Sequence, residues 1–165
     1  LKQFAEFGSP ATATPKPQST ATAKPTSTPT QTQKPSGNGS FSDANGFTAD
    51  ELMLIAQVVH REANGSSIEA QAAVANVIYN RIKSSGFPDT VKGVIFQKYQ
   101  FSVANDSIYS VTPSATAVAA VKQIFVNGDM LLPDNVLYFR SSSKGTSWSA
   151  FTYYATYGGN SFFYK

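Results

Sequence analysis

One carboxylate in this sequence combines a side chain that can donate a proton with a position that would shield it from water. At about 100° per residue, residues 48–63 place their apolar side chains on one arc of a helical wheel: Leu52, Ile55, Ala56, Val58 and Val59. Glu62 falls within this arc, between the directions of Ile55 and Val58. Burial disfavours the charged form of a carboxyl group and raises its pKa. A carboxyl that stays protonated near neutral pH can protonate the leaving oxygen when a glycosidic bond breaks.

The residues after Glu62 favour a position at the edge of a cleft. Ala63-Asn64-Gly65 interrupts the helix directly after Glu62, and a new helix start follows at once. Catalytic groups are often held where a rigid element meets a loop. A glutamate on an apolar face at a helix end is also common as a structural residue, paired with a cation or reaching towards solvent. The wheel places three polar residues roughly on the opposite side: Asp50, Gln57 and Arg61.

Six downstream residues are candidates for the wall of a sugar-binding site: Gln100, Phe101, Ser102, Asn105, Tyr138 and Trp148. Aromatic faces can stack on sugar rings, and amides can hydrogen-bond to hydroxyl and acetamido groups. Ordinary core or strand packing would explain Phe101 and Tyr138 equally well. Trp148 is the better candidate, because its neighbours in residues 145–149 have the composition of a loop.

The composition argues against several other chemistries. The chain has no cysteine, which excludes disulfides, thiolate metal sites and a papain-like peptidase. His60 is the only histidine, and the wheel directs it towards the polar side, where it lacks the partners of a zinc site. We therefore expect a surface or supporting role for His60, no metal and no cofactor, which also argues against zinc amidase chemistry. No nucleophile-elbow pattern surrounds any serine.

The elements that must position these residues begin with two helices. A capping box at residues 48–51 predicts the start of the first helix, and a second box at residues 66–69 predicts a longer helix that Gly86 stops. A short helix is expected within residues 90–97. A fourth helix is expected from Pro113, which a helix start tolerates, to Gly128.

The C-terminal part has a different pattern. Residues 136–140, 151–157 and 161–164 are rich in aromatic and β-branched side chains, which predicts short strands. Residues 98–112 lack clean periodicity. The predicted fold class is therefore α+β, a mainly helical body with a small antiparallel β element at its C-terminal end.

Composition also divides the chain near residue 45. Residues 1–45 are rich in Ser, Thr, Pro and Lys, which predicts a disordered, semi-stiff linker. Residues 46–165 are enough for one domain with a single core. They hold nine Lys and Arg against eight Asp and Glu, so the pI of about 9.1 does not mark a nucleic-acid-binding face. No apolar run is long enough to cross a membrane.

Three groups of segments match, in order, the pattern of a known protein family. VVHREANGSSIEAQAAVANVIYNRI (58–82) resembles a Glu-Ala-x-Gly opening, a Glu-x-Gln step and an Ala/Val helix ending in Asn-Arg. FPDTVKGVIFQ (87–97) and QFSVANDS (100–107) resemble its Phe-Pro-x-Thr, Gly-Val-Ile and Gln-Phe-Ser segments, while VLYF (136–139), Trp148 and GGNSFFY (158–164) resemble its closing strands. The family is that of the cell wall hydrolases that include the spore-cortex-lytic enzymes of spore-forming bacteria.

The resemblance extends over essentially all of residues 48–165. It implies a fold related to the lysozyme-like transglycosylases and cleavage of peptidoglycan with Glu62 as the essential acid. Two positions depart from the family pattern: Ser66 stands where the family often has a second acid, and Ser161 stands where it usually has histidine. Either change could alter substrate preference or rate.

Two mechanisms remain open for such a cleavage. A hydrolase usually flanks the sugar bond with two carboxylates, and Asp106 is the one downstream carboxylate that we consider as an assistant. A lytic transglycosylase needs a single acid, because the C6 hydroxyl of the sugar attacks in place of water and leaves a 1,6-anhydro end. The single well-placed Glu62 favours this route, with cleavage between N-acetylmuramic acid and N-acetylglucosamine. The alternatives are a hydrolytic muramidase and a non-catalytic wall-glycan-binding module.

The expected partners follow from this interpretation. We expect the protein to bind peptidoglycan glycan strands and neither nucleic acid nor a membrane, as a monomer tethered by its linker to an upstream wall-binding domain. The expected location is extracellular, in the cell wall or spore cortex, with a role in germination. Leu1–Phe7 lacks the apolar core of a signal peptide, so we expect any export signal to have been removed.

Overall fold

The first helix begins at its predicted capping box. In the computed structural model, which describes residues 41–165, the Thr48 hydroxyl accepts a hydrogen bond from the Glu51 amide (3.2 Å), and the Glu51 carboxylate accepts one from the Thr48 amide (2.9 Å). Of the linker predicted for residues 1–45, residues 1–40 lie outside the described part of the chain. The elements are α1 (Ala49–Ala63), α2 (Ile68–Lys83), α3 (Val91–Ile95), η1 (Asp106–Ser110), α4 (Ala115–Val121), η2 (Lys122–Asn127), β1 (Val136–Ser141), η3 (Ser142–Lys144), β2 (Thr152–Tyr157) and β3 (Asn160–Tyr164).

The start of α2 differs by one residue from the predicted box. Ser67, and not Ser66, is the N-cap, and its hydroxyl accepts a hydrogen bond from the Ala70 amide (3.3 Å). The Ser66-x-x-Glu69 spacing alone does not reveal this shift, because an adjacent serine can cap equally well. Because Ser67 is the N-cap, the side chain of Ser66 does not cap the helix.

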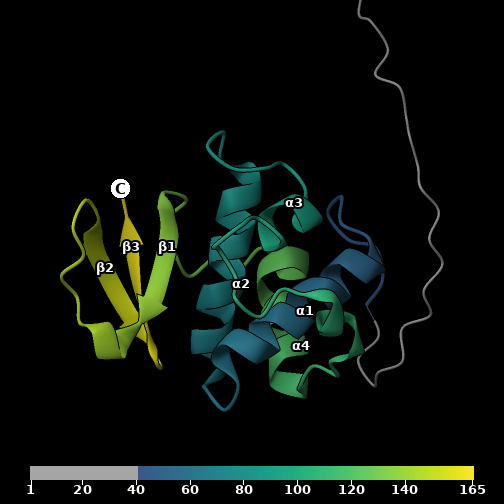
Figure 1. Ribbon diagram of the computed structural model, residues 1–165. Helices are drawn as coiled ribbons and strands as arrows, with labels where there is room; N and C mark the ends of the chain where they lie inside the picture. Colours follow the sequence, from purple (N-terminus) through teal and green to yellow (C-terminus); the bar gives the residue numbers. More distant parts are fainter. Residues whose placement is uncertain (1–40) are drawn as a thin grey trace, which may run out of the picture. The chain divides into compact units, whose positions relative to one another are not determined.

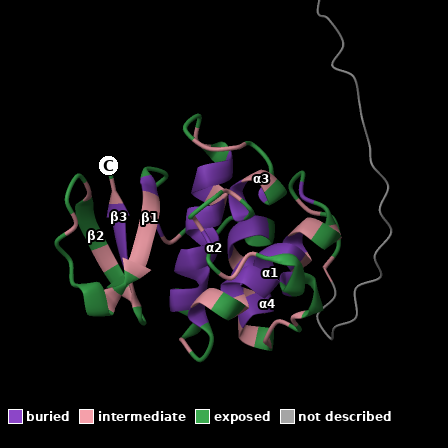
Figure 2. Ribbon diagram, in the orientation of Figure 1, coloured by how far each residue is buried: buried purple, intermediate pink, exposed green. Residues whose placement is uncertain are grey.

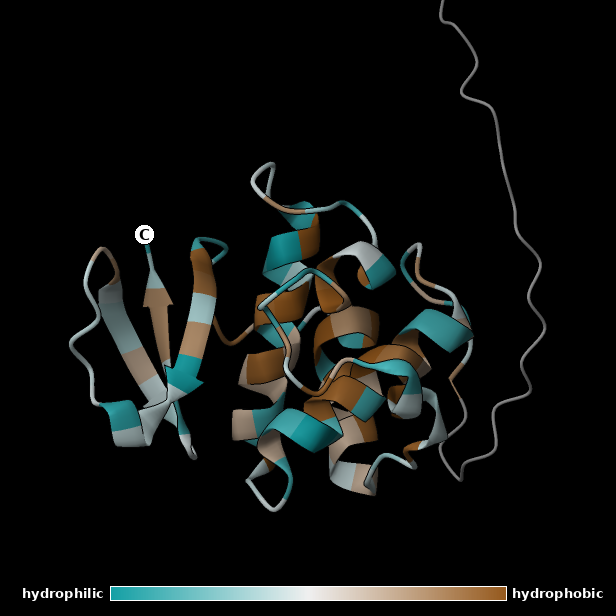
Figure 3. Ribbon diagram, viewed as in Figure 1, coloured by the Kyte–Doolittle hydropathy of each residue, from teal (hydrophilic) through white to brown (hydrophobic). Residues whose placement is uncertain are grey.

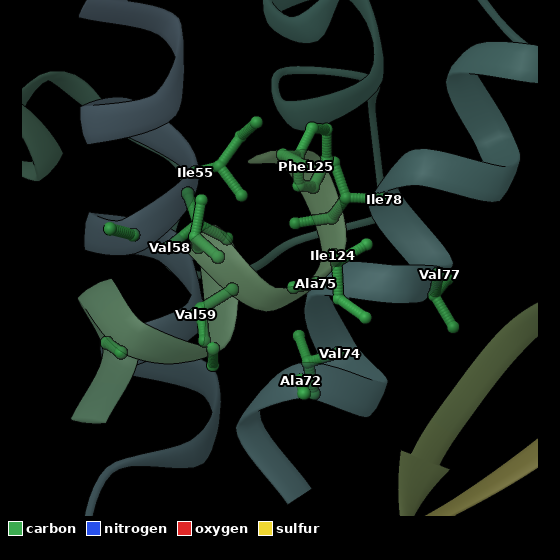
Figure 4. Packing of buried hydrophobic residues seen from close by; sticks show 14 of the residues in the cluster. Ile55, Val58, Val59, Ala72, Val74, Ala75, Val77, Ile78, Ile124 and Phe125 are labelled. Carbon is green, nitrogen blue, oxygen red and sulfur yellow. The ribbon is translucent and has the colours of Figure 1, made fainter. Parts of the chain in front are cut away.

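Helices α1, α2 and α4, with η2, enclose the hydrophobic core. Figure 4 shows side chains of the core converging from α1, α2 and η2: Ile55, Val58, Val59, Val74, Ile78, Ile124 and Phe125. Their burial accounts for the apolar periodicity of all three segments, and Figure 3 shows hydrophobic stretches along these helices. The predicted fourth helix is α-helical only as far as Val121 and continues as a π-helix to Asn127, where Gly128 (φ 77°) ends it.

Gln57 is buried, contrary to the exposed position that the helical wheel predicts. The wheel places it on the polar side of α1, yet its side chain is 6% exposed. The 3-10 helix η1 covers this side of α1, and the Gln57 amide donates hydrogen bonds to the carbonyls of Tyr109 (3.2 Å) and Val111 (3.0 Å). A wheel describes one helix by itself, so it does not show which polar residue a later segment will cover.

The C-terminal strands form the predicted antiparallel sheet, in the order β1-β3-β2. Figure 1 shows the sheet beside α2, which contacts β1. The central strand β3 is buried at Ser161, Phe162 and Phe163, whereas β2 is largely exposed (Figure 2). Within residues 41–165, four α-helices with this small sheet confirm the predicted α+β class. No helix within residues 41–165 has both the length and the apolar character that a bilayer crossing needs.

A buried amide network ties α2 to the segment that enters the sheet. The Asn76 side-chain oxygen accepts hydrogen bonds from the backbone amides of Leu131 (2.7 Å) and Leu132 (2.8 Å). Its NH₂ group donates to Asn80 (3.0 Å), which in turn donates to the carbonyls of Pro133 (2.7 Å) and Val136 (3.0 Å). This network fixes the start of β1 against the helical body.

Residues 41–45 also contact the helical body. The Asn45 side chain, at φ 51°, donates to the carbonyls of Phe125 and Val126, both at 2.9 Å. The Asp43 carboxylate accepts from the Ala49 amide at 2.8 Å, beside the start of α1, and Phe41 packs against the core. These contacts hold the C-terminal end of η2 against the segment that leads into α1.

Candidate active site

The turn between α1 and α2, the segment after α3 and one end of the sheet border a cleft of about 530 Å³. Its lining residues come from three parts of the chain: Glu62, Ala63, Asn64 and Ser66; Tyr99, Gln100 and Ser102; and Phe139, Arg140, Ser141, Lys144, Gly159 and Asn160. Glu62 is the one carboxylate of this lining. The structure therefore brings the candidate acid to a cleft bordered mainly by polar groups.

Glu62 lies in the last turn of α1 and is partly buried. Burial raises the pKa of its carboxyl group, and the positive charge of Arg81 opposes this shift. The net direction is upward, so desolvation is the larger effect. The carboxyl thus has the two properties that a general acid needs, access to a cleft and a stronger hold on its proton.

Arg81 is a buried cation behind the cleft. It is 3% exposed, its Nε donates to the Leu137 carbonyl (2.7 Å), and its guanidinium carbon lies 5.2 Å from the ring centroids of both Phe87 and Phe101. Burial lowers the pKa of Arg81 to about 10, against the charges of Tyr138 and Glu62, which raise it. At any pH near neutrality the group therefore stays charged and can stabilise the ionised form of Glu62.

The raised pKa of Glu62 predicts an effect on stability. A carboxyl whose pKa is higher in the folded than in the unfolded state stabilises the fold below its unfolded pKa, and this contribution is lost as pH rises through the folded pKa. Glu62→Gln removes the charge that burial disfavours. We therefore expect this variant to unfold at a higher temperature than the wild type at neutral pH, with the difference vanishing below the ordinary carboxyl pKa. Calorimetry at both pH values checks this, and an equal midpoint at neutral pH would contradict it.

Two of the six predicted wall residues, Gln100 and Ser102, line the cleft. Phe101, between them, is 5% exposed and packs against Phe139 at a centroid distance of 6.1 Å, besides contacting Arg81. It supports the wall from behind and does not line it. The alternative of core packing therefore describes Phe101 better than a sugar contact does.

The other three predicted wall residues lie outside the lining. Asn105 caps η1, where its side-chain oxygen accepts from the Ser107 amide (3.0 Å). The Tyr138 ring packs on Phe151 at a centroid distance of 4.4 Å. The half-buried Trp148 ring packs against Phe151 (4.4 Å) and Phe163 (5.3 Å), and the Arg140 guanidinium lies 5.0 Å from its centroid, so its contact with a sugar stays a prediction.

Asp106, the candidate second carboxylate, is exposed in η1 and is not part of the cleft lining. Ser161, at the position where the family usually has histidine, also lies outside the cleft lining. It is 1% exposed, and its hydroxyl shares a hydrogen bond of 3.0 Å with Thr156 within the sheet. Ser66, at the position of the family's frequent second acid, does line the cleft. His60 accepts a hydrogen bond from the Ser114 amide (3.3 Å) at the start of α4.

The basic and aromatic part of the lining was not predicted from the sequence. Arg140 donates from Nη2 to the carbonyls of Lys144 (2.9 Å), Gly145 (3.2 Å) and Ser147 (2.6 Å), and so fixes the loop that forms one edge of the cleft. Lys144 and Tyr99 are exposed and border the same cleft. Their spacing carries no signal, because they join the site only when the sheet packs beside α2.

Comparisons with known proteins agree with this architecture. A family model described as Cell Wall Hydrolase matches residues 65–164, a range that begins three residues after Glu62. A Spore cortex-lytic enzyme of Bacillus cereus is 35% identical over 115 residues, which cover 70% of this chain and 44% of the relative. The enzyme of the same name from Bacillus subtilis is 36% identical over 103 residues, 62% of this chain and 33% of the relative. This chain thus spans less than half the length of these relatives.

Two solved structures have the same fold. The catalytic domain of the Bacillus cereus SleB protein is 32% identical, with a TM-score of 0.64, and the match covers 78% of this chain and all of that domain. The catalytic domain of a germination-specific lytic transglycosylase, SleB from Bacillus anthracis, is 32% identical, with a TM-score of 0.65, and is matched over its full length by 74% of this chain. The family resemblance found in the sequence is confirmed, and the chain belongs to the cell wall hydrolase family.

Proposed function

We propose that this protein cleaves the glycan strands of bacterial peptidoglycan between N-acetylmuramic acid and N-acetylglucosamine, as a lytic transglycosylase with Glu62 as acid and base. The carrying observation is the partly buried Glu62, with a raised pKa, in a cleft whose lining holds no second carboxylate among the described residues. A mechanism that needs one acid fits this lining better than one that needs two.

The reaction divides into two proton transfers. Protonated Glu62 donates its proton to the glycosidic oxygen, and the bond between that oxygen and C1 of the muramoyl residue breaks. Ionised Glu62 then accepts the proton of the C6 hydroxyl, whose oxygen bonds to C1 and closes a 1,6-anhydro ring. No water is consumed, and Glu62 ends the cycle protonated as it began.

Arg81 fits this two-stage role of Glu62. After the first transfer the carboxylate is negatively charged, and the buried guanidinium lowers the energy of this state. Because desolvation outweighs the effect of Arg81, the carboxyl holds its proton more strongly than an exposed glutamate would. Gln100 and Ser102, which line the cleft, supply hydrogen-bonding groups for the hydroxyl and acetamido groups of the sugars.

The names of the relatives support this proposal. The relatives with matching sequences are called spore cortex-lytic enzymes, and one solved neighbour is called a germination-specific lytic transglycosylase. We extend this to the present chain as a wall- or cortex-degrading protein that acts outside the cytoplasm. The preceding linker would then hold the catalytic domain near its substrate by attachment to a wall-binding domain.

Product analysis tests the proposal and separates its rivals. We expect digestion of purified peptidoglycan by the full chain to release fragments with 1,6-anhydromuramic ends, which are lighter by one water molecule than hydrolytic products and resist borohydride reduction. Mass spectrometry before and after reduction measures both properties. Reducing muramic ends would show a hydrolytic muramidase, whereas binding to the wall without release would show a glycan-binding module.

A further inference from the structure

Tyr99 has a backbone conformation and an exposure that its role in the fold does not explain. Its φ of 66° is in the left-handed region, and its side chain is 90% exposed. Steric crowding of Cβ makes this region unfavourable by about 1 kcal/mol or more for a residue other than glycine. An exposed aromatic ring gives little packing energy in return, so glycine would serve the turn better.

The place of Tyr99 in the molecule suggests what the ring is for. Tyr99 lines the same cleft as Glu62 and precedes Gln100, which also lines it. Within the described residues, Tyr99 is the most exposed of the large hydrophobic side chains. Strained residues often mark functional positions, so this backbone outlier beside the cleft indicates a role for Tyr99.

We propose that the Tyr99 ring forms a sugar-stacking subsite at the mouth of the cleft, which binds one pyranose ring of the glycan strand. The proposal rests on the proposed function, because it assigns this subsite to the strand that Glu62 cleaves. The negative face of an aromatic ring attracts the weakly positive C–H groups on the face of a sugar. A high exposure in the free protein leaves the ring available for this contact.

Lys98 restricts which face of the ring takes the sugar. Its ammonium group lies 4.8 Å from the centroid of the Tyr99 ring, in the geometry of a cation–π contact. The ammonium group thereby lies over one face of the ring, and we place the sugar on the opposite face. The same charge stands close enough to the stacking position to attract a carboxylate of the strand.

The experiment compares ring variants in a chain that binds but does not cut. In a Glu62→Gln background, Tyr99→Gly should weaken binding to peptide-free glycan strands roughly tenfold, while Tyr99→Phe should stay within about twofold, because stacking needs the ring and not the hydroxyl. Isothermal titration with purified strands measures binding. Tyr109→Ala is the matched control, since Tyr109 is an exposed aromatic residue that the cleft lining does not include.

Thermal unfolding separates this role from a structural one. Glycine tolerates the left-handed region, so Tyr99→Gly should not lower the unfolding midpoint. Binding of the glycine variant within about twofold of its parent, or an equal loss in the phenylalanine variant, would overturn the subsite. Failure of the wild-type chain to release fragments would refute the proposed function, while the binding comparison still decides the subsite. Failure of the parent variant to bind any strand would overturn the subsite, whatever the wild-type chain releases.

Discussion

Substitution of Glu62 by glutamine should lower the rate of glycan-strand cleavage by about 10³-fold, the usual contribution of a general acid. Glutamine keeps the size of the side chain at the end of α1 but can neither donate the proton to the leaving oxygen nor take one from the C6 hydroxyl. Because Glu62 is partly buried at the cleft and carries a raised pKa, the neutral amide should leave the fold intact. Fragment release from purified peptidoglycan measures the rate.

Two carboxylate controls sharpen this test. Asp106→Asn and Glu69→Gln change exposed carboxylates outside the cleft lining, so both should release fragments at a rate close to that of the wild type. A large loss in the Asp106 variant would favour the two-carboxylate hydrolase instead.

The wild-type rate should also fall as pH rises through the raised pKa of Glu62, because only the protonated acid can start the reaction. Fragment release by Glu62→Gln at the wild-type rate would contradict the assignment of Glu62 as the acid.

Asn76→Ala should destabilise the domain by about 3 kcal/mol, because an unpaired buried polar group costs about 1–3 kcal/mol. Asn76 is fully buried, and its oxygen accepts from the amides of Leu131 and Leu132. Alanine leaves both amides without this acceptor and leaves Asn80 without its donor. We expect the unfolding midpoint to fall by roughly 10 °C in a domain of this size.

The same variant should also reduce activity below the unfolding temperature. The amide network fixes the segment that enters β1, and β1 carries three residues of the cleft lining: Phe139, Arg140 and Ser141. Asn135→Ala is the matched control, since Asn135 is exposed in the turn before β1 and should change neither quantity. Equal stability of the two alanine variants, measured by chemical denaturation, would show that the network does not hold the sheet in place.

Local pattern was enough to predict the elements and the setting of Glu62. The capping box at Thr48 and the apolar arc of α1 depend on residues within three or four positions of each other, and such contacts exist in any helix that the segment forms. The order and hydrophobic character of the strands likewise predicted the small sheet. The catalytic role of Glu62 stays a prediction, although the structure places its side chain at a cleft.

What tertiary structure decided is the composition of the cleft. Its lining joins residues 62–66, 99–102 and 139–160, which meet because β1 packs against α2 and the segment after α3 passes the same end. Trp148 and Tyr138 looked available in the sequence, yet other aromatic rings contact them, whereas Tyr99 gave no signal and is exposed at the site. The physical reason is that burial of a side chain depends on which distant segment covers it. A sequence fixes local backbone preferences and apolar periodicity directly, but that choice of neighbour is settled only when the whole core packs.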